Sequence, residues 1–212
     1  MRMSRVKEFT HEFVPASAGA ATTLVMLHGT GGDERDLLPL GRALHPTAAL
    51  LSPRGQVLER GMPRFFRRFA EGSFDLDDVR VRAAELAAWL DDAAAAYGLA
   101  RDRMVAVGYS NGANIAHATL LLHPGSLAGA ALLHAQLVIS PEPRPDLTGA
   151  ALFLAAGSAD PIVPIAEARK LADLLTAAGA VVTPYWSPGG HALTREDVAQ
   201  AQAWLNSAGF AS

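Results

Sequence analysis

The sequence contains no cysteine, and this absence excludes several kinds of chemistry at once. A disulfide-stapled fold, a zinc–thiolate site and a cysteine nucleophile all require that residue. Charge is also sparse: charged residues make up 18% of the 212 residues, and the formal net charge is only −3. The sequence therefore gives no electrostatic reason to expect nucleic acid or an anionic membrane as a partner.

Long apolar runs are missing as well. The alanine-rich stretches are interrupted by charges and glycines, so none approaches the length that spans a membrane. The N-terminal sequence MRMSRVKEFTHEF lacks an apolar core of signal-peptide length, and we therefore expect a cytoplasmic protein. Half of the residues are hydrophobic, which is enough for one large core and predicts a single domain over residues 1–212.

Short apolar runs alternate with longer amphipathic ones along the chain. The short runs are typical of buried strands, at 23–29, 48–55, 103–110, 127–138, 149–157 and 180–190. Helical patterns separate most of them, at 33–46, 75–98, 111–125, 164–179 and 194–209. Strands joined by helices indicate a mainly parallel sheet with helices on both faces. Residues 56–74 fit neither pattern and are predicted to be irregular.

One motif joins the apolar run at 103–110 to the helical pattern that follows it. The sequence there reads GYSNG, with Ser110 between Gly108 and Gly112. This matches the G-x-S-x-G nucleophile elbow, a sharp strand-to-helix turn that projects the serine hydroxyl above the sheet edge. Glycines are needed on both sides because helix and strand approach too closely there for side chains. The simpler alternative is a tight turn with an N-capping serine and no chemistry.

A serine hydroxyl becomes a nucleophile when a base removes its proton and a carboxylate orients that base. On a sheet of this kind the three residues follow in the order serine, acid, histidine. Asp160 in SADPIVP follows one predicted strand, and His191 in PGGHALT follows the last. Parallel strands all end at the same edge, so Ser110, Asp160 and His191 are predicted to meet there as a catalytic triad.

Rival residues are placed less well for this role. Asp146 precedes its strand and so belongs to the opposite edge of the sheet. His28 ends a strand at the right edge but precedes the serine in the chain, and we expect it to brace its loop through hydrogen bonds. The other histidines lie near the N-terminus, within or at the end of helical patterns, or in or just after a strand: His11, His45, His117, His123 and His134. Turn formation by Asp160 and helix capping by His191 are the alternatives without chemistry.

The oxyanion of an acyl-transfer intermediate needs two backbone N–H donors. One is expected from the residue after the nucleophile, Asn111, and the other from the loop LHGTGGDE, in which Thr30 is the candidate. The glycines of this loop allow backbone N–H groups to face inward. A phosphate-binding loop is the alternative, but neither G-x-x-x-x-G-K-[ST] nor G-x-G-x-x-G is present.

Together, LHGTGGDE, GYSNGA, SADPIVP and PGGHALT resemble the motifs of the α/β-hydrolase superfamily, and most closely those of the phospholipase/carboxylesterase family, which includes acyl-protein thioesterases. The resemblance extends from Leu27 to about Leu205 and implies the same triad and the same oxyanion donors. LSPRG…MPRFFRR and GYSNGANIA look most like a bacterial carboxylesterase branch, some members of which are associated with hydroquinone resistance. Thr30 departs from thioesterase relatives, which often carry a bulky apolar residue at this position.

The surroundings of the site are expected to be open. Only SPEPRPDLTG separates the strands predicted to end near Ile139 and to begin near Ala150, which is too short for a cap domain. The segment RGMPRFFRRFAEGSF combines arginines with phenylalanines, so it is a core-packed loop, a wall of the substrate pocket or a dimer surface. Candidate substrate contacts in and beyond this segment are Met62, Phe65, Phe66, Gln136, Leu137 and Ile162.

These residues predict a serine carboxylesterase that hydrolyses small or exposed carboxylic esters without a metal or a cofactor. Two other functions stay open. A thioesterase or lysophospholipase would need an apolar groove long enough for an acyl chain. A non-catalytic ligand-binding protein on the same fold would be expected to have lost a member of the triad, and all three are present here.

Overall fold

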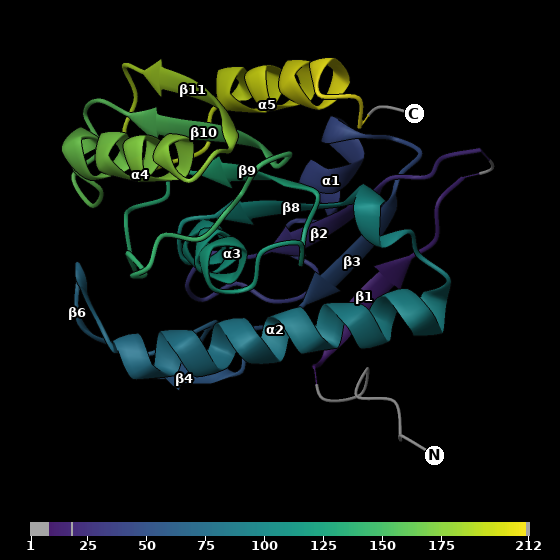
Figure 1. Ribbon diagram of the computed structural model, residues 1–212, viewed down its shortest axis with the longest axis horizontal. Helices are drawn as coiled ribbons and strands as arrows, with labels where there is room; N and C mark the ends of the chain where they lie inside the picture. Colours follow the sequence, from purple (N-terminus) through teal and green to yellow (C-terminus); the bar gives the residue numbers. More distant parts are fainter. Residues whose placement is uncertain (1–8, 18, 211–212) are drawn as a thin grey trace.

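A seven-stranded sheet forms the centre of the protein (Figure 1). The computed structural model describes residues 9–17 and 19–210. The expectation that the N-terminal sequence is not a signal peptide rests mostly on residues 1–8, which lie outside the described residues. The strand order is β1-β3-β2-β8-β9-β10-β11, and only β1 runs antiparallel to its neighbour. The bounds are β1 His11–Val14, β2 Thr23–Leu27, β3 Ala49–Pro53, β8 Met104–Tyr109, β9 Gly129–Leu133, β10 Ala151–Gly157 and β11 Val181–Ser187.

Helices cover both faces of the sheet, as the alternation of patterns predicts. They are α1 Leu38–Leu44, α2 Leu76–Tyr97, α3 Asn111–Leu122, α4 Ile165–Ala177 and α5 Arg195–Ser207, with a short 3-10 turn at Arg101–Arg103. Side chains alternate across β2: Val25 and Leu27 join the core under α2, α3 and α4, whereas Leu24 and Met26 join the core under α1 and α5. Every residue of the four adjacent strands β3, β2, β8 and β9 except Tyr109 is buried, as expected for a sheet covered on both faces.

Several boundaries differ from the predicted ones. The edge strand β1 is not predicted, because a half-buried strand of four residues is held by pairing with β3 rather than by its own pattern. The helix expected from residue 33 begins at Leu38, since the Asp33 carboxylate instead accepts a hydrogen bond from the Arg35 N–H (2.8 Å) in a turn. The strand expected over 127–138 ends at Leu133.

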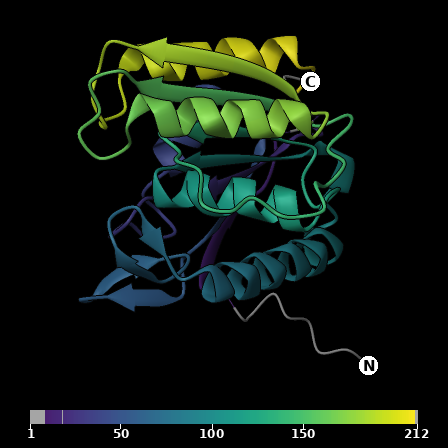
Figure 2. The same cartoon turned by 60° about the vertical axis from the view of Figure 1, so that its left-hand side comes forward.

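The segment predicted to be irregular forms two small β-hairpins beside the start of α2 (Figure 2). They pair β4 (Val57–Glu59) with β5 (Met62–Arg64), and β6 (Arg68–Ala70) with β7 (Ser73–Phe74). Their strands are too short to show an alternating pattern, which is why the sequence does not reveal them.

No helix in the described part of the chain is long and apolar enough to cross a membrane. Residues 134–150 join β9 to β10 without a helix or strand, so no cap domain covers the sheet edge at this point. The prediction that residues 1–212 form a single domain is consistent with one central sheet and stays a prediction for the whole chain.

Candidate active site

Ser110 occupies a strained turn between β8 and α3. Its φ angle is 51°, in the left-handed region that side chains disfavour, and its N–H donates to the carbonyl of Leu133 on β9 (2.9 Å). A Cβ added to Gly108 would lie 2.6 Å from the backbone of Ala113, and one added to Gly112 would overlap the Leu27 carbonyl. The two glycines are therefore required by close approach of the backbone, as the motif predicts.

The structure brings Ser110, His191 and Asp160 into one hydrogen-bonded chain. Ser110 Oγ lies 2.9 Å from His191 Nε2, and His191 Nδ1 lies 2.7 Å from Asp160 Oδ2. The three residues follow β8, β11 and β10 and meet because these parallel strands end at the same edge. With the proton on Nδ1, the imidazole donates to the carboxylate and accepts from the serine, which is the arrangement that activates a hydroxyl.

The Asp160 carboxylate is buried and firmly held. Its Oδ1 accepts hydrogen bonds from the N–H groups of Ile162 (2.8 Å) and Val163 (3.0 Å), while its Oδ2 faces the histidine. Burial by itself would raise the pKa of Asp160, but the hydrogen bonds from Val163, His191 and Ile162 outweigh burial and hold the pKa below its ordinary value. Asp160 is thus an ionised carboxylate at neutral pH, as an orienting group must be.

The histidine loop is fixed by a further residue that sequence reasoning did not single out. The Tyr109 hydroxyl donates to the carbonyl of His191 (2.9 Å), and the two rings lie 5.5 Å apart. Burial and the negative charge of Asp160 raise the pKa of Tyr109, so the hydroxyl keeps its proton for this bond. Its place in the x position of G-x-S-x-G is the only signal in the sequence, and that position accepts many residues.

Thr30 and Asn111 both line the cavity into which Ser110 opens. Neither of their N–H groups has a hydrogen-bond acceptor within the described residues, and the Asn111 N–H belongs to the first turn of α3. The cavity has a volume of about 260 Å³. Its other walls come from the hairpins, α3 and the acid and histidine loops: Arg64, Arg68, Glu71, Phe74, Tyr109, Asn114, Ile162 and His191.

Arg64, on β5, ties the first hairpin to the oxyanion loop. Its Nη1 donates to Thr30 Oγ1 (2.9 Å) and to Glu59 (3.1 Å), and only 3% of its side chain is exposed. Glu59 in turn pairs with Arg68, whose other partner is Glu71. These oppositely charged side chains form a network that runs from the buried Arg64 to the exposed Glu71. The sequence could not indicate this network, because the four side chains come together only after the hairpins have formed.

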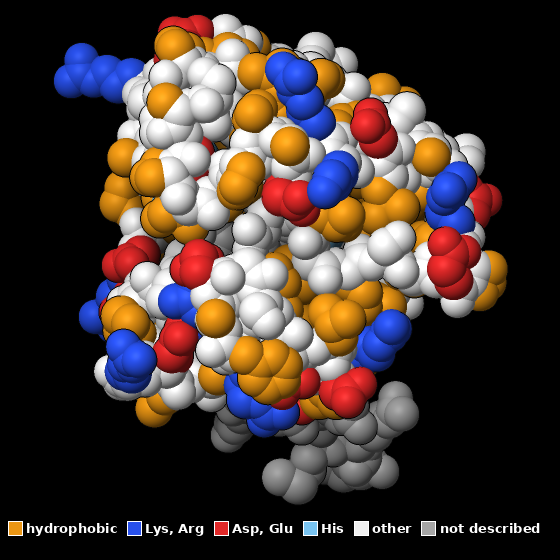
Figure 3. Space-filling view, turned by 90° about the vertical axis from the view of Figure 1, so that its left-hand side faces the viewer, with side chains coloured by type: hydrophobic (Ala, Val, Ile, Leu, Met, Phe, Trp, Pro, Cys, Tyr) orange, Lys and Arg blue, Asp and Glu red, His pale blue; other side chains and the backbone are white. Residues whose placement is uncertain are grey.

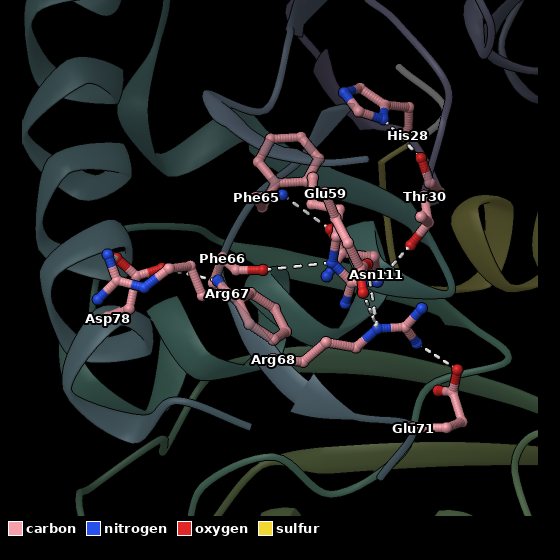
Figure 4. A network of polar contacts seen from close by, with 12 residues as sticks. His28, Thr30, Glu59, Phe65, Phe66, Arg67, Arg68, Glu71, Asp78 and Asn111 are labelled. Atoms are coloured by element: carbon pink, nitrogen blue, oxygen red, sulfur yellow. Dashed lines mark hydrogen bonds and ion pairs between the residues drawn. The ribbon is translucent and has the colours of Figure 1, made fainter. Parts of the chain in front are cut away.

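Asn111 holds the same segment from the other side. Its side-chain oxygen accepts a hydrogen bond from the Phe65 N–H (2.8 Å), as Figure 4 shows. His28 braces the neighbouring loop as expected, because its Nδ1 bonds to the Gly29 carbonyl (2.7 Å) and its Nε2 accepts from the Gly55 N–H (2.9 Å). Burial lowers the pKa of His28, which suits this neutral bridging role.

The six predicted substrate contacts have different positions. Ile162 lies on the cavity wall. Phe65 and Phe66 are buried in the core, where Phe65 packs on the His28 ring, so the core-packed reading of this segment applies to them. The others lie off this cavity: Met62 is exposed near Gly31, Gln136 is buried and bonded to Asn114 and His117, and Leu137 packs on the core.

One further histidine reaches the site. His134 Nδ1 lies 3.6 Å from Asp160 Oδ2, and its ring is 5.6 Å from that of His191. Together, His134, Asp160 and His191 place three potential metal-ligating atoms within 4.8 Å of one another. An ion bound by all three would have to replace the 2.7 Å hydrogen bond between His191 and Asp160, so we expect this group to act without a metal.

Comparison with known proteins agrees with this fold. The family model described as Phospholipase/Carboxylesterase matches residues 10–208. The protein MhqD of Bacillus subtilis (strain 168) is 46% identical over 185 residues, which cover 87% of this chain and 92% of MhqD.

Two solved structures are also similar. The Bacillus cereus carboxylesterase superposes with a TM-score of 0.92 at 45% identity and covers 94% of both chains. The structure of YahD with malic acid has a TM-score of 0.88 at 29% identity and covers 94% of this chain and 99% of YahD.

The sheet, the elbow and these relationships define an α/β hydrolase without a large cap domain. The chain belongs to the phospholipase/carboxylesterase family and is a carboxylic ester hydrolase.

Proposed function

We propose that this protein is a serine carboxylesterase that works through Ser110, His191 and Asp160. The observation that carries the proposal is the unbroken chain of hydrogen bonds, 2.9 Å from Ser110 to His191 and 2.7 Å from His191 to Asp160. Its occurrence on a nucleophile elbow supports a catalytic role over a merely structural one.

The reaction begins when Ser110 Oγ attacks the ester carbonyl carbon and His191 Nε2 takes the hydroxyl proton. The Asp160 carboxylate keeps the proton of Nδ1 in place and stabilises the imidazolium that forms. The carbonyl oxygen becomes an oxyanion, which accepts hydrogen bonds from the Thr30 and Asn111 N–H groups. His191 then protonates the leaving alcohol, and an acyl-enzyme remains.

Water completes the cycle by the reverse route. His191 removes a proton from the water as its oxygen attacks the acyl carbon, and the second oxyanion occupies the same two N–H groups. The acid leaves when Ser110 recovers its proton from the imidazolium. Each step uses only groups of this chain, its substrate and water.

The cavity supports a small ester as the substrate. Its volume of about 260 Å³ lies below the range of roughly 300–1,000 Å³ that is usual for small-molecule sites. Arginine, glutamate and asparagine side chains contribute much of its wall. The view onto this edge of the sheet shows acidic and basic side chains scattered among hydrophobic ones (Figure 3). The malic acid bound in YahD is likewise small and polar.

The rival function, hydrolysis of long-chain thioesters or lysophospholipids, would use the same triad with a different substrate site. Ile162 and Phe74 are the cavity's large apolar side chains, and they do not make an acyl groove by themselves. We therefore rank the short-chain esterase first.

The test is hydrolysis of p-nitrophenyl esters from acetate to palmitate by the wild type and by Ser110→Ala. We expect activity that is highest for the shortest chains and absent from the variant. Activity that survives the substitution would disprove the role of Ser110. A preference for palmitate would instead identify the thioesterase or lysophospholipase. If no ester is cleaved, labelling by a fluorophosphonate separates an activated serine from a non-catalytic binding protein.

A further inference from the structure

His134 stands directly behind the proposed triad, at the end of β9. That strand lies between β8, which leads to Ser110, and β10, which leads to Asp160. The residue is fully buried, and its N–H donates to the carbonyl of Ala155 (2.8 Å). Its φ angle of 56° is left-handed, like the 51° of Ser110. Two neighbouring strand ends therefore carry non-glycine residues in a disfavoured conformation, which is a frequent mark of functional positions.

The imidazole of His134 lies between two buried carboxylates. Nδ1 is 3.6 Å from Asp160 Oδ2, and Nε2 is 3.6 Å from Asp197 Oδ2. At most 1% of either carboxylate side chain is exposed. Neither ring nitrogen has a hydrogen-bond partner within the described residues, so at 3.6 Å both contacts are longer than a hydrogen bond.

Asp197 belongs to the first turn of α5, the helix that follows the histidine loop. Its Oδ2 accepts hydrogen bonds from the N–H (2.8 Å) and the hydroxyl (2.7 Å) of Thr194, and its own N–H donates to Thr194 Oγ1 (3.1 Å), so the two residues form a capping box. His134 thus faces a buried carboxylate on each side.

The two carboxylates bear on the charge of the ring, because each has an oxygen 3.6 Å from one of its nitrogens. A neutral imidazole has one N–H and one lone pair, whereas an ionised carboxylate only accepts. A neutral His134 would direct a lone pair at one of the two carboxylates, and only the imidazolium offers an N–H to both. The remaining titratable groups around the ring are Tyr109, with ring centres 6.1 Å apart, and His191 at 5.6 Å.

We propose that His134 is a positively charged positioning residue that bridges Asp160 to Asp197 and so fastens the acid loop to the start of α5. This rests on the proposed role of the triad. The positive charge offsets two buried negative charges beside His191. Without that charge the carboxylates would favour protonated His191, which is unable to accept the serine proton at neutral pH.

The charge of His134 is measured directly by NMR of the wild-type protein labelled with ¹⁵N-histidine. We expect both ring nitrogens of His134 to give the protonated signature from pH 6 to pH 8. In Asp197→Asn, which removes one of the two anions, the imidazolium should lose its proton at a lower pH than in the wild type. A wild-type spectrum with one protonated and one bare nitrogen at pH 7 overturns the proposal.

The positioning role is tested by the pH profile of kcat/KM in His134→Gln. We expect the acidic limb to move to higher pH by about one unit, because a positive charge near His191 has been removed. The plateau value of kcat/KM should fall on the order of tenfold, because Asp160 loses its contact with His134 and is held less firmly. The matched control is His117→Gln, an equally buried histidine outside the triad, in which the acidic limb should stay in place.

A lower plateau with an unmoved acidic limb would show that His134 only fills space, and would overturn the proposal. If His134→Gln fails to fold, the wild-type NMR spectrum still decides the charge. Failure of the proposed function is recognised separately, because it appears as activity that survives Ser110→Ala, whatever the state of His134.

Discussion

Gly112 at the start of α3 lies against the backbone carbonyl of Leu27 at the end of β2. A methyl group at Gly112 would overlap that oxygen, so the helix after the nucleophile and the strand before the oxyanion loop are in direct backbone contact. The distance between Ser110 and Thr30 is therefore set by the absence of a side chain at Gly112.

Replacing Gly112 with alanine should push α3 away from β2. We expect the free energy of unfolding to fall by about 3 kcal/mol, since the overlap involves backbone on both sides. Esterase activity should fall with it, because the Asn111 N–H moves relative to Thr30. Urea unfolding beside a p-nitrophenyl acetate assay checks both. Ser110→Ala is the comparison, since it should lose the activity and keep the stability; an equally stable Gly112→Ala would contradict the close-approach argument.

Asp160→Asn should leave the fold intact and remove most of the activity. The amide neither stabilises the imidazolium nor fixes the same histidine tautomer, so we expect kcat to fall on the order of 10⁴-fold with little change in KM. The control is Asp146→Asn, because Asp146 lies before β10 and bonds to the Thr148 N–H (2.9 Å), away from the site. Equal losses in the two variants would refute the assignment of Asp160.

Arg64→Met should affect both stability and catalysis. The substitution removes the bond to Thr30 and leaves Glu59 with Arg68 alone, so we expect a loss of about 2–3 kcal/mol and a lower kcat as the oxyanion loop loosens.

The matched control for Arg64→Met is Arg67→Met on the same segment. The Arg67 side chain is 58% exposed and pairs with Asp75 and Asp78, and Asp78 keeps a second partner in Arg82, so the loss of Arg67 should cost less than about 1 kcal/mol. Thermal unfolding and steady-state kinetics of both variants measure the two losses. Indistinguishable results for the two variants would argue against a role for Arg64 in holding Thr30.

His117 should make the protein less stable in mild acid. Burial lowers the pKa of His117 to about 4, below the ordinary value of about 6.5 in the unfolded chain. The unfolded state therefore binds the extra proton first, and stability is complete above pH 6.5 and lost as the pH falls toward 4. Between pH 7 and pH 5 the loss is about 2 kcal/mol. Urea unfolding at both pH values should show this loss in the wild type and less of it in His117→Gln.

The strand–helix alternation and the four motif loops could be predicted from local sequence. Most strands of the central sheet are short apolar runs, and Ser110, Asp160 and His191 lie within four residues after the ends of three of these strands. In a parallel sheet the position of a residue after its strand also gives its edge, so the meeting of these three side chains follows from chain order and handedness alone.

The sequence by itself thus determined the fold class, the glycine requirements at Gly108 and Gly112, and the residues that meet at the sheet edge. Only the tertiary structure decided that β1 pairs with β3, that Arg64 reaches Thr30, and that His134 stands between Asp160 and Asp197. The reason is physical: periodicity and motifs record interactions between near neighbours in the chain. These other contacts join residues far apart in sequence, and their partners are chosen by strand order and packing.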